Sequence, residues 1–340
     1  MKPKLNTVSA FSGALLSDTP VSGQVTVANA DAFEAANLST PLTRFISALP
    51  ADNIQAVLDM LFPSIPGGMI VQYRKLDDLL FLTETDDEDI RAEGGDFKRV
   101  EIRGTAALDT LKQKGLTYRQ DVLTIPRGID GQPLPGWENQ RAAWLQQRLI
   151  RAEILRGLAA LRTAGGAATA KTWNASSNPD KDLRALVKAS RTGSGIRPTH
   201  VIFGDTAWQT RQDAYEDSTR ANQNMTAHAN YDEAALARYL KVEKVAVVEA
   251  LYQAAKDGAK SEILANEVIA YAAPSGQSME DPSSIKRITA PASLLDGGGS
   301  SAFAVYIKRS SIYVDITVAH MSTFLVPQTS GVKRYTTSGS

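Results

Sequence analysis

The three histidines are the residues best suited to acid–base or metal chemistry in this chain, but their spacing gives them no shared motif. His200, His228 and His320 lie far apart, and none falls in a His-Glu-x-x-His or comparable ligand pattern. The chain has no cysteine, which excludes disulfides, cysteine nucleophiles and thiolate metal sites. We expect each histidine to be an ordinary structural or surface residue, with a triad assembled by the fold as the alternative.

The densest group of potential cation ligands is the acidic run from Glu84 to Asp89, "ETDDED". It lacks the twelve-residue spacing of a calcium loop, so we expect a solvated turn rather than a metal site. The chain also lacks the Gly-x-Ser-x-Gly elbow of serine hydrolases and the Gly-x-x-x-x-Gly-Lys-Ser/Thr phosphate loop. The sequence therefore predicts no catalytic, cofactor-binding or metal-binding residue, and we expect neither a cofactor nor an enzymatic activity.

Composition narrows the class of protein further. The 340 residues include 37 basic and 37 acidic side chains, so the net charge is zero, which disfavours a freestanding sequence-specific nucleic-acid binder. A neutral surface also repels copies of itself little. The first residues have no sustained apolar core, and the apolar stretch 56–71 is broken by Asp59, Pro63 and Pro66. We therefore expect no signal peptide, no membrane span and a soluble cytoplasmic chain.

Residues 69–103 are expected to form a long hairpin. "MIVQYRK" and "LLFLTET" are β-prone, "DFKRVEIRG" alternates apolar and charged side chains, and the acidic run lies between them. An isolated two-stranded hairpin is marginally stable in water. Two arrangements follow from this: the hairpin folds back on its own domain, or it projects and needs another surface to lie on.

The strongest helical pattern covers Glu138–Gly165. Leu145, Leu149 and Leu155 lie on one stripe, and further apolar residues widen it. At 1.5 Å per residue the helix is about 40 Å long, well above the average. The helix also carries Arg148, Arg151 and Glu153 among other charged residues, which are typical of a solvated helix face or of contacts with other subunits.

The second half of the chain alternates helices and strands, which indicates a mixed α/β region over residues 167–326. Asn178 followed by proline predicts a helix start, with Leu183 and its neighbours one turn on at the buried face. "THVIFG" is expected to be a strand, after which Asp205 is expected to cap the next helix. We expect the last residues, 331–340, to form a flexible tail.

The order of these features resembles the major capsid proteins of tailed bacteriophages, which have the Hong Kong phage capsid fold, and most of all the lambda-type (E-type) family. The most specific stretches are "TWNASSNPDKDLRALVKAS" and the "GIRPTHVIFGDTAWQ" that follows it. The later "KVEKVAVVEALYQ" and "SEILANEVIAYAAPSG" also look like strands of that family. The resemblance covers roughly residues 40–330 and implies an α+β fold. It implies these domains: an N-terminal arm with short helices (1–68), an extended E-loop hairpin (69–103), a peripheral domain (104–194 and 301–330) with a spine helix (138–165), an axial domain (195–300) and a flexible tail (331–340).

The resemblance also implies a function in assembly. Copies would form pentamers and hexamers of an icosahedral shell that encloses packaged double-stranded phage DNA, held non-specifically on the inner face. The protein would be located in the virion, and in the host cytoplasm during assembly. Its partners would be further copies of itself, a separate scaffold protein, the portal and a decoration protein, with no membrane. Candidate inter-subunit contacts are the charged residues of the hairpin and of the spine helix: Arg99, Glu101, Arg103, Arg148, Arg151 and Glu153.

Three alternatives stay open. An encapsulin-type nanocompartment shell would share the fold and enclose cargo enzymes instead of DNA. Another structural component of a phage virion, such as a tail or baseplate protein, would also self-assemble. An α/β enzyme with an unrecognised site would differ in class, and a pocket with perturbed carboxylates would favour it.

Overall fold

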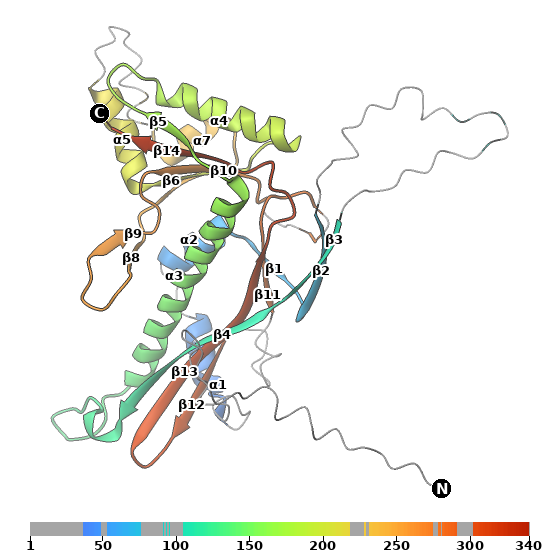
Figure 1. Ribbon diagram of the computed structural model, residues 1–340. Coiled ribbons are helices and arrows are strands. Elements are labelled where there is room, and N and C mark those ends of the chain that lie inside the picture. The colour runs from blue at the N-terminus through green and yellow to red at the C-terminus, as the bar shows by residue number, and fades with distance from the viewer. Residues whose placement is uncertain are drawn as a thin grey trace, which may run out of the picture.

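A single long helix, α3 (Trp137–Gly165), packs against both of the two main sheets (Figure 1). The fold is that of a computed structural model, which describes residues 37–48, 53–75, 91, 93, 95, 105–217, 228, 231–274, 278–279, 281–290 and 302–339. The expected helix over 138–165 is confirmed. Its apolar stripe is buried at Leu145, Leu149, Ile154 and Leu158, as helical spacing requires.

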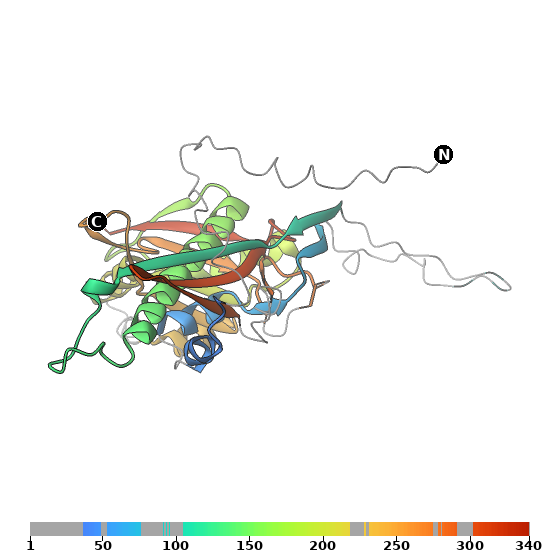
Figure 2. The ribbon, with the colours of Figure 1, turned by 90° about the horizontal axis from the view of Figure 1, so that it is seen from below.

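The first sheet is built around β13 (Tyr313–Leu325), the longest strand of the described chain. β4 (Lys112–Asp121) pairs antiparallel with β13, and so do β12 (Phe303–Arg309) and β11 (Lys286–Ala290). β1 (Ser64–Pro66) adds to β11 as a parallel strand. Figure 2 shows β4 and β13 crossing α3 side by side, so segments far apart in the sequence form one layer over the helix.

The second sheet has the strand order β5 (Thr169–Thr172), β14 (Lys333–Ser338), β10 (Glu267–Tyr271), β6 (His200–Gly204) and β7 (Lys244–Val248). β10 pairs antiparallel with both β14 and β6, whereas β5 joins β14 and β7 joins β6 in parallel. The sheet is therefore mixed, and together with the separate first sheet it confirms the expected α+β class.

Helices cover both faces of the second sheet. On one face, α3 and α2 (Asn53–Leu61) form a core with the sheet, in which Leu158, Ile202 and Ile269 are fully buried. On the other face lie α4 (Pro179–Ser194), α5 (Asp205–Glu216) and α7 (Glu233–Leu240). The remaining short helix, α1 (Thr40–Ala48), packs against the first sheet and the N-terminal half of α3. Two helix layers around one sheet make this part of the molecule a complete core of its own.

The local signals for α4 are confirmed, and those for α5 are partly wrong. The Asn178 side chain accepts a hydrogen bond from the Lys181 amide at 3.1 Å, and α4 ends at Gly195 with a left-handed backbone, φ 72°. Asp205, expected to cap α5, is instead its first residue, and Gly204 takes the cap position without a side-chain bond. Any Cβ at Gly204 would lie 1.8 Å from the Ala265 carbonyl oxygen, so the close approach of this backbone requires glycine there.

Two of the expected domain boundaries differ from the observed packing. The expected flexible tail is wrong, because β14 lies inside the second sheet between β5 and β10, with Val332 and Tyr335 buried. The expected peripheral domain included residues up to 194, but β5 and α4 pack with the second sheet. The short polar strand "KRYTTS" gave no apolar pattern from which its burial could be predicted.

Candidate functional site

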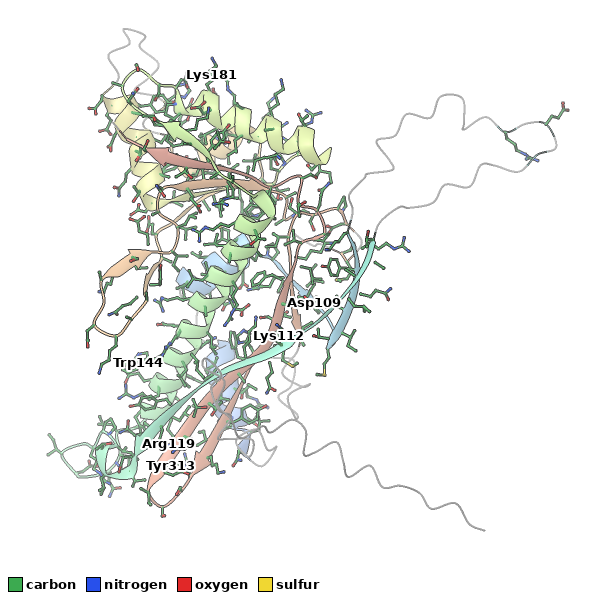
Figure 3. All side chains as sticks on the ribbon, viewed as in Figure 1. Asp109, Lys112, Arg119, Trp144, Lys181 and Tyr313 are labelled. Atoms are coloured by element: carbon green, nitrogen blue, oxygen red, sulfur yellow. The ribbon has the colours of Figure 1, made fainter. Side chains whose placement is uncertain are left out.

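A two-stranded ribbon projects from the edge of the first sheet, and one of its faces is anchored to the body (Figure 1). The ribbon consists of β2 (Ile70–Lys75) and β3 (Thr105–Thr110), paired antiparallel from Ile70↔Thr110 to Lys75↔Thr105. On the inner face, Val71 is buried in the core under the first sheet. Asp109, labelled in Figure 3, accepts a hydrogen bond from Thr323 Oγ1 at 2.9 Å. These contacts hold the base of the ribbon in a defined orientation.

The opposite face of the ribbon carries apolar side chains that nothing in the described part of the chain covers. Ile70 is 69% exposed, Leu108 is 72% exposed, and the adjoining Met69 is 53% exposed. In the observed register Leu108 pairs with Gln72, two residues from Ile70, so Ile70 and Leu108 are diagonal neighbours on one face. Paired strands with one buried and one exposed apolar face are a ready surface for another chain.

A second group of exposed apolar residues lies at the opposite end of the first sheet. We call this region the tip; it comprises η4 (Val122–Thr124), the loop 125–136, the turn 310–312 and the start of α3. It contains five large apolar side chains that are at least 45% exposed: Leu123, Ile129, Leu134, Trp144 and Ile312. The ribbon, the adjoining Met69 and the tip together account for eight of the nine exposed large hydrophobic residues of the described chain, so exposure is concentrated at two ends of the first sheet.

Charged groups fix the shape of the tip. The Arg119 guanidinium donates two hydrogen bonds of 2.8 Å to the carboxylate of Asp315, which is almost fully buried. Arg119 also lies 3.9 Å above the ring of Tyr313, and both are labelled in Figure 3. The bonds to Asp315 raise the pKa of Arg119 above its ordinary value. The strand ends that carry the tip are thus held by a bidentate ion pair of well-defined geometry.

The charged residues predicted to make inter-subunit contacts have different outcomes. Arg99, Glu101 and Arg103 lie outside the described residues, as does the acidic run from Glu84 to Asp89. Arg148 is exposed and Arg151 is half-buried, and both line a groove between α3 and the hairpin of β8 (Leu251–Gln253) and β9 (Lys260–Glu262). Their predicted role stays a prediction.

Glu153 does not occupy the exposed position expected for it, and that expectation is wrong. It is 2% exposed, and its carboxylate accepts hydrogen bonds from Lys114 Nζ at 2.8 Å and from Ser322 Oγ at 2.7 Å. His320 Nε2 lies 3.2 Å away. Burial alone would raise the pKa of Glu153, but His320 and Lys114 hold it well below its ordinary value. The carboxylate therefore joins α3 to β4 and β13 within the subunit.

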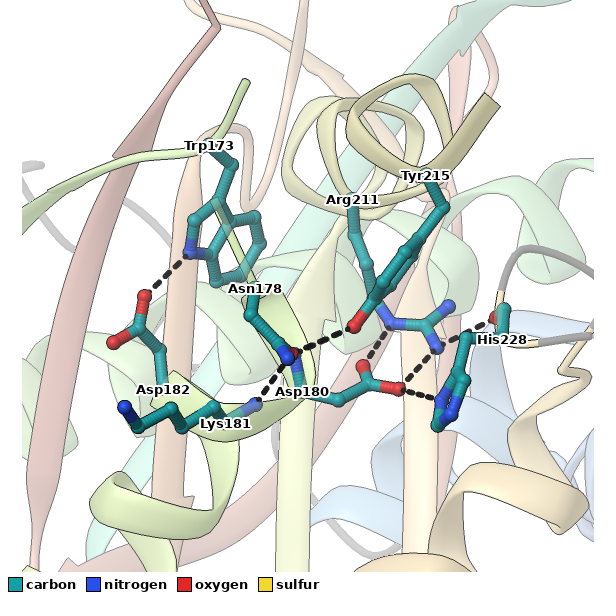
Figure 4. Close-up of polar contacts among 8 residues, drawn as sticks. All are labelled: Trp173, Asn178, Asp180, Lys181, Asp182, Arg211, Tyr215 and His228. Atoms are coloured by element: carbon teal, nitrogen blue, oxygen red, sulfur yellow. Dashed lines mark hydrogen bonds and ion pairs between the residues drawn. The ribbon is translucent and has the colours of Figure 1, made fainter. Parts of the chain in front are cut away.

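A second buried polar cluster lies between α4 and α5 (Figure 4). Arg211, which is fully buried, donates to both carboxylate oxygens of Asp180, at 2.8 and 3.2 Å. His228 Nδ1 lies 2.7 Å from the same carboxylate. The Tyr215 hydroxyl donates to Asn178 Oδ1 at 3.2 Å and accepts from the Asp180 amide at 3.0 Å. These bonds tie the start of α4 to α5, which is a structural use of the charges.

The three histidines are not brought together. His200 lies in β6 with its Nδ1 at 2.8 Å from Thr199 Oγ1, His228 joins the Asp180 cluster, and His320 lies beside Glu153. Among the residues described, no group of three or more histidines and carboxylates is placed to hold a metal ion. None of the helices described is both long enough and apolar enough to span a bilayer.

Comparisons with known proteins show the fold. No protein-family model matches the sequence. No curated protein sequence matches it either. Among solved structures, a phage-related protein from Bordetella bronchiseptica RB50 matches with a TM-score of 0.57 at 14% identity, covering 88% of this chain and 97% of that one.

Two further solved structures are less similar. A putative capsid protein of a prophage from E. coli CFT073 has a TM-score of 0.47 at 12% identity, covering 88% of this chain and 99% of that one. A virus-like particle from Pyrococcus furiosus has a TM-score of 0.45 at 11% identity, covering 88% of this chain and 97% of that one. The likeness to the Bordetella protein establishes a shared fold over nearly the whole length of that chain.

The exposed residues of the ribbon and the tip are the part of the site that sequence reasoning missed. The alternation in "MIVQYRK" places Ile70 opposite to Val71 and Tyr73, so one apolar residue had to lie on the other face. Leu123 lies just before a turn-rich segment and Ile129 lies within it, and both side chains are exposed. Both signals were present in the sequence, but only the packing of the body shows which face is covered.

Proposed function

We propose that this chain is a major capsid protein, which self-associates into pentamers and hexamers that close into an icosahedral shell around packaged double-stranded phage DNA. The observation that carries the proposal is the pair of uncovered apolar surfaces, ribbon and tip, on a subunit whose core is otherwise complete. The fold shared with a phage-related protein supports it. The sequence resemblance favours the lambda-type family.

The arrangement suits a shell because the two surfaces differ and lie at opposite ends of the first sheet (Figure 1). A contact between different surfaces of identical subunits is heterologous, and it generates closed rings when its rotation closes. Full burial of one Ile or Leu side chain contributes about 1.5–3 kcal/mol. Each contact can be weak, because a closed ring requires several of them at once.

The proposal also covers the partners of the protein, its location and whether it is an enzyme. The packaged DNA would lie against the inner face without sequence recognition, and assembly would involve a scaffold protein, the portal and a decoration protein, with no membrane. The protein would act in the host cytoplasm during assembly and in the virion thereafter. In this proposal the protein has no enzymatic activity, and the buried Asp180 and Glu153 carboxylates hold helices and strands together.

The test is the state of association of the purified full chain, measured by sedimentation and negative-stain electron microscopy, with and without a co-expressed scaffold. The expected result is capsomer rings or closed shells. A subunit that stays single at high concentration would contradict the proposal. Particles that contain enzymes instead of DNA would favour the nanocompartment alternative, and open tubes would favour a tail component.

A further inference from the structure

The groove between α3 and the β8–β9 hairpin, about 600 Å³ in volume, carries positive charge on both of its walls. Arg148 and Arg151 line it from α3, and Lys256 lines it from the hairpin turn, against a single acid, Asp257. Within the described part of the chain, none of the three basic side chains forms an ion pair or a hydrogen bond. We call this region the basic groove, and the subunit itself leaves its positive charge unpaired.

The other arginines of α3 are already engaged within the subunit. Arg156 and Arg162 form ion pairs with carboxylates of the same chain. The Arg141 guanidinium lies 4.3 Å above the ring of Trp144. The two arginines of the basic groove are therefore the ones on this helix whose charged groups remain available to a partner.

The positive charge of the basic groove is local. A second groove of about 1040 Å³ adjoins it along α3 and shares Arg151 with it. Charges in the second groove balance, because Arg151 and Lys244 lie in the same lining as Glu233 and Glu249. The whole chain is also neutral, with 37 basic and 37 acidic residues. A local excess on a neutral chain suits weak, non-specific contacts better than tight binding by one subunit.

The arrangement of the basic groove suits the phosphate groups of a nucleic-acid backbone. Arg148 and Arg151 are three residues apart, which is about 4.5 Å along the helix axis. Successive phosphates of one DNA strand are about 3.4 Å apart along the duplex axis, so two long side chains can reach neighbouring phosphates. A guanidinium binds phosphate through two parallel hydrogen bonds, and a lysine ammonium acts as a point charge. Contacts of this kind carry no sequence preference.

We propose that Arg148, Arg151 and Lys256 bind phosphate groups of the packaged DNA in the assembled shell. This rests on the proposed function, which places DNA against every subunit. One subunit supplies few phosphate contacts and binds DNA weakly, but a shell presents the same groove many times, so the contacts act together. Each contact is electrostatic and releases counterions, so binding weakens steeply as the salt concentration increases.

The test measures binding of a fluorescein-labelled short duplex DNA to the purified full chain by fluorescence anisotropy, between about 50 and 200 mM salt. Arg148→Gln with Arg151→Gln should weaken binding about ten-fold at the lowest salt. The slope of log K against log salt should fall by about 0.9 for each contact removed, and Lys256→Gln should lower it once more. Duplexes of unrelated sequence should bind equally.

A control pair on α4 removes the same charge from another exposed surface. Arg184→Gln with Arg191→Gln should leave the salt slope unchanged. Equal losses in the groove pair and the control pair, or no loss in either, would overturn the inference. If the wild type nevertheless forms shells, the proposed function stands, whereas a wild-type chain that stays single at high concentration and binds no DNA would overturn both.

A second pair of variants tests whether the groove acts through charge. Arg148→Lys with Arg151→Lys keeps both positive charges and loses the fork of the guanidinium, so the salt slope should stay as in the wild type while the affinity falls. A slope reduced as much as in the glutamine pair would show that these positions act through shape, which contradicts the inference.

Two other anions distinguish DNA from competing occupants. Polyglutamate is the probe for an acidic protein segment, and inorganic phosphate is the probe for a free ion, both at matched ionic strength. The groove substitutions should reduce binding of the duplex more than binding of either probe. If they reduce binding of polyglutamate or of inorganic phosphate and leave that of the duplex unchanged, the groove takes a different anion and the inference is wrong.

Closed shells provide an independent check, because packaged DNA reaches the groove only from inside. Long linear DNA added from outside should bind dissociated subunits and should bind closed, empty shells little. Closed shells that bind the added DNA, and lose this binding on Arg148→Gln with Arg151→Gln, would place the groove on the outer surface and overturn the inference.

Discussion

The second sheet and the ribbon are built from the same kind of paired strand, but they differ in how many of their faces are covered. The second sheet has α2 and α3 on one face and α4, α5 and α7 on the other, and its inner strand β6 is buried throughout. The ribbon has one anchored face and one that exposes Ile70 and Leu108. The difference indicates that the second sheet stabilises the subunit, whereas the ribbon is completed by another molecule.

The largest expected effect is on the free energy of unfolding, and it comes from the polar cluster between α4 and α5, the helices that cover one face of the second sheet. Asp180→Ala leaves the fully buried guanidinium of Arg211 without its carboxylate, so the free energy of unfolding should fall by about 3–5 kcal/mol. Chemical denaturation of the single subunit checks this. Lys188→Ala, on the exposed side of the same helix, is the control and should change the free energy by less than about 0.5 kcal/mol. An Asp180→Ala subunit as stable as the wild type would mean that this cluster is not what joins α4 to α5.

The uncovered face of the ribbon should show the opposite behaviour. Ile70→Ser with Leu108→Ser removes two exposed apolar side chains, so the unfolding free energy of the subunit should change by less than about 1 kcal/mol. Assembly should weaken by about 3 kcal/mol per subunit, because these side chains become buried only between copies. Sedimentation measures the assembled fraction. Gln72→Ser, on the same face, is the control, and equal assembly of all three chains would show that the ribbon makes no such contact.

A pH effect follows from the covered sheet. Burial lowers the pKa of His200 to about 4, from an ordinary value of 6.5. Between these values the unfolded chain binds a proton that the folded chain does not, so the free energy of unfolding falls as pH decreases from 6.5 to 4. The loss from this residue is at most about 3 kcal/mol. His200→Phe retains a ring beside Tyr271, and its stability should decrease less than that of the wild type over this window.

The same pH series also shows which result would contradict the role given to His200. If the wild type and His200→Phe lose stability in parallel between pH 6.5 and pH 4, then His200 takes up its proton in the folded state and other groups cause the decrease. The difference between the two curves is the quantity to compare, since the remaining carboxylates and histidines titrate in both proteins.

The smallest expected effect concerns the tip. Leu123→Ser or Ile129→Ser removes one exposed apolar side chain, so each should weaken assembly by about 1 kcal/mol and leave the stability of the subunit unchanged. Gln132→Ser in the same loop is the control. If the tip variants assemble as well as this control in sedimentation, the tip is not part of an interface between copies.

Local structure could be predicted from the sequence wherever neighbouring residues decide it. The cap at Asn178 and the long stripe of α3 depend on spacing within one helix, and both were correct. The place of β14 could not be predicted, since its partners β5 and β10 lie far away in the sequence and its own residues are polar. A flexible tail was the ordinary expectation for such a segment.

The candidate site was predicted less well, because charge alone does not say where a side chain points. Glu153 lies on α3 among arginines, yet it faces Lys114 and Ser322 across the helix–sheet interface. Arg148 and Arg151 face the groove, and only the β8–β9 hairpin, which is distant in the sequence, creates that groove. The exposure of Ile70 and Leu108 likewise depends on which face of the ribbon the body covers.

Hydrogen–deuterium exchange in assembled and unassembled protein tests the central claim most directly. In the second sheet, amides 200–204 and 267–271 should be protected equally in both states, because that sheet is complete in one subunit. Amides 70–75 and 105–110 of the ribbon should exchange more slowly only after assembly. Ribbon amides that exchange at the same rate in assembled particles and in single subunits would contradict the account.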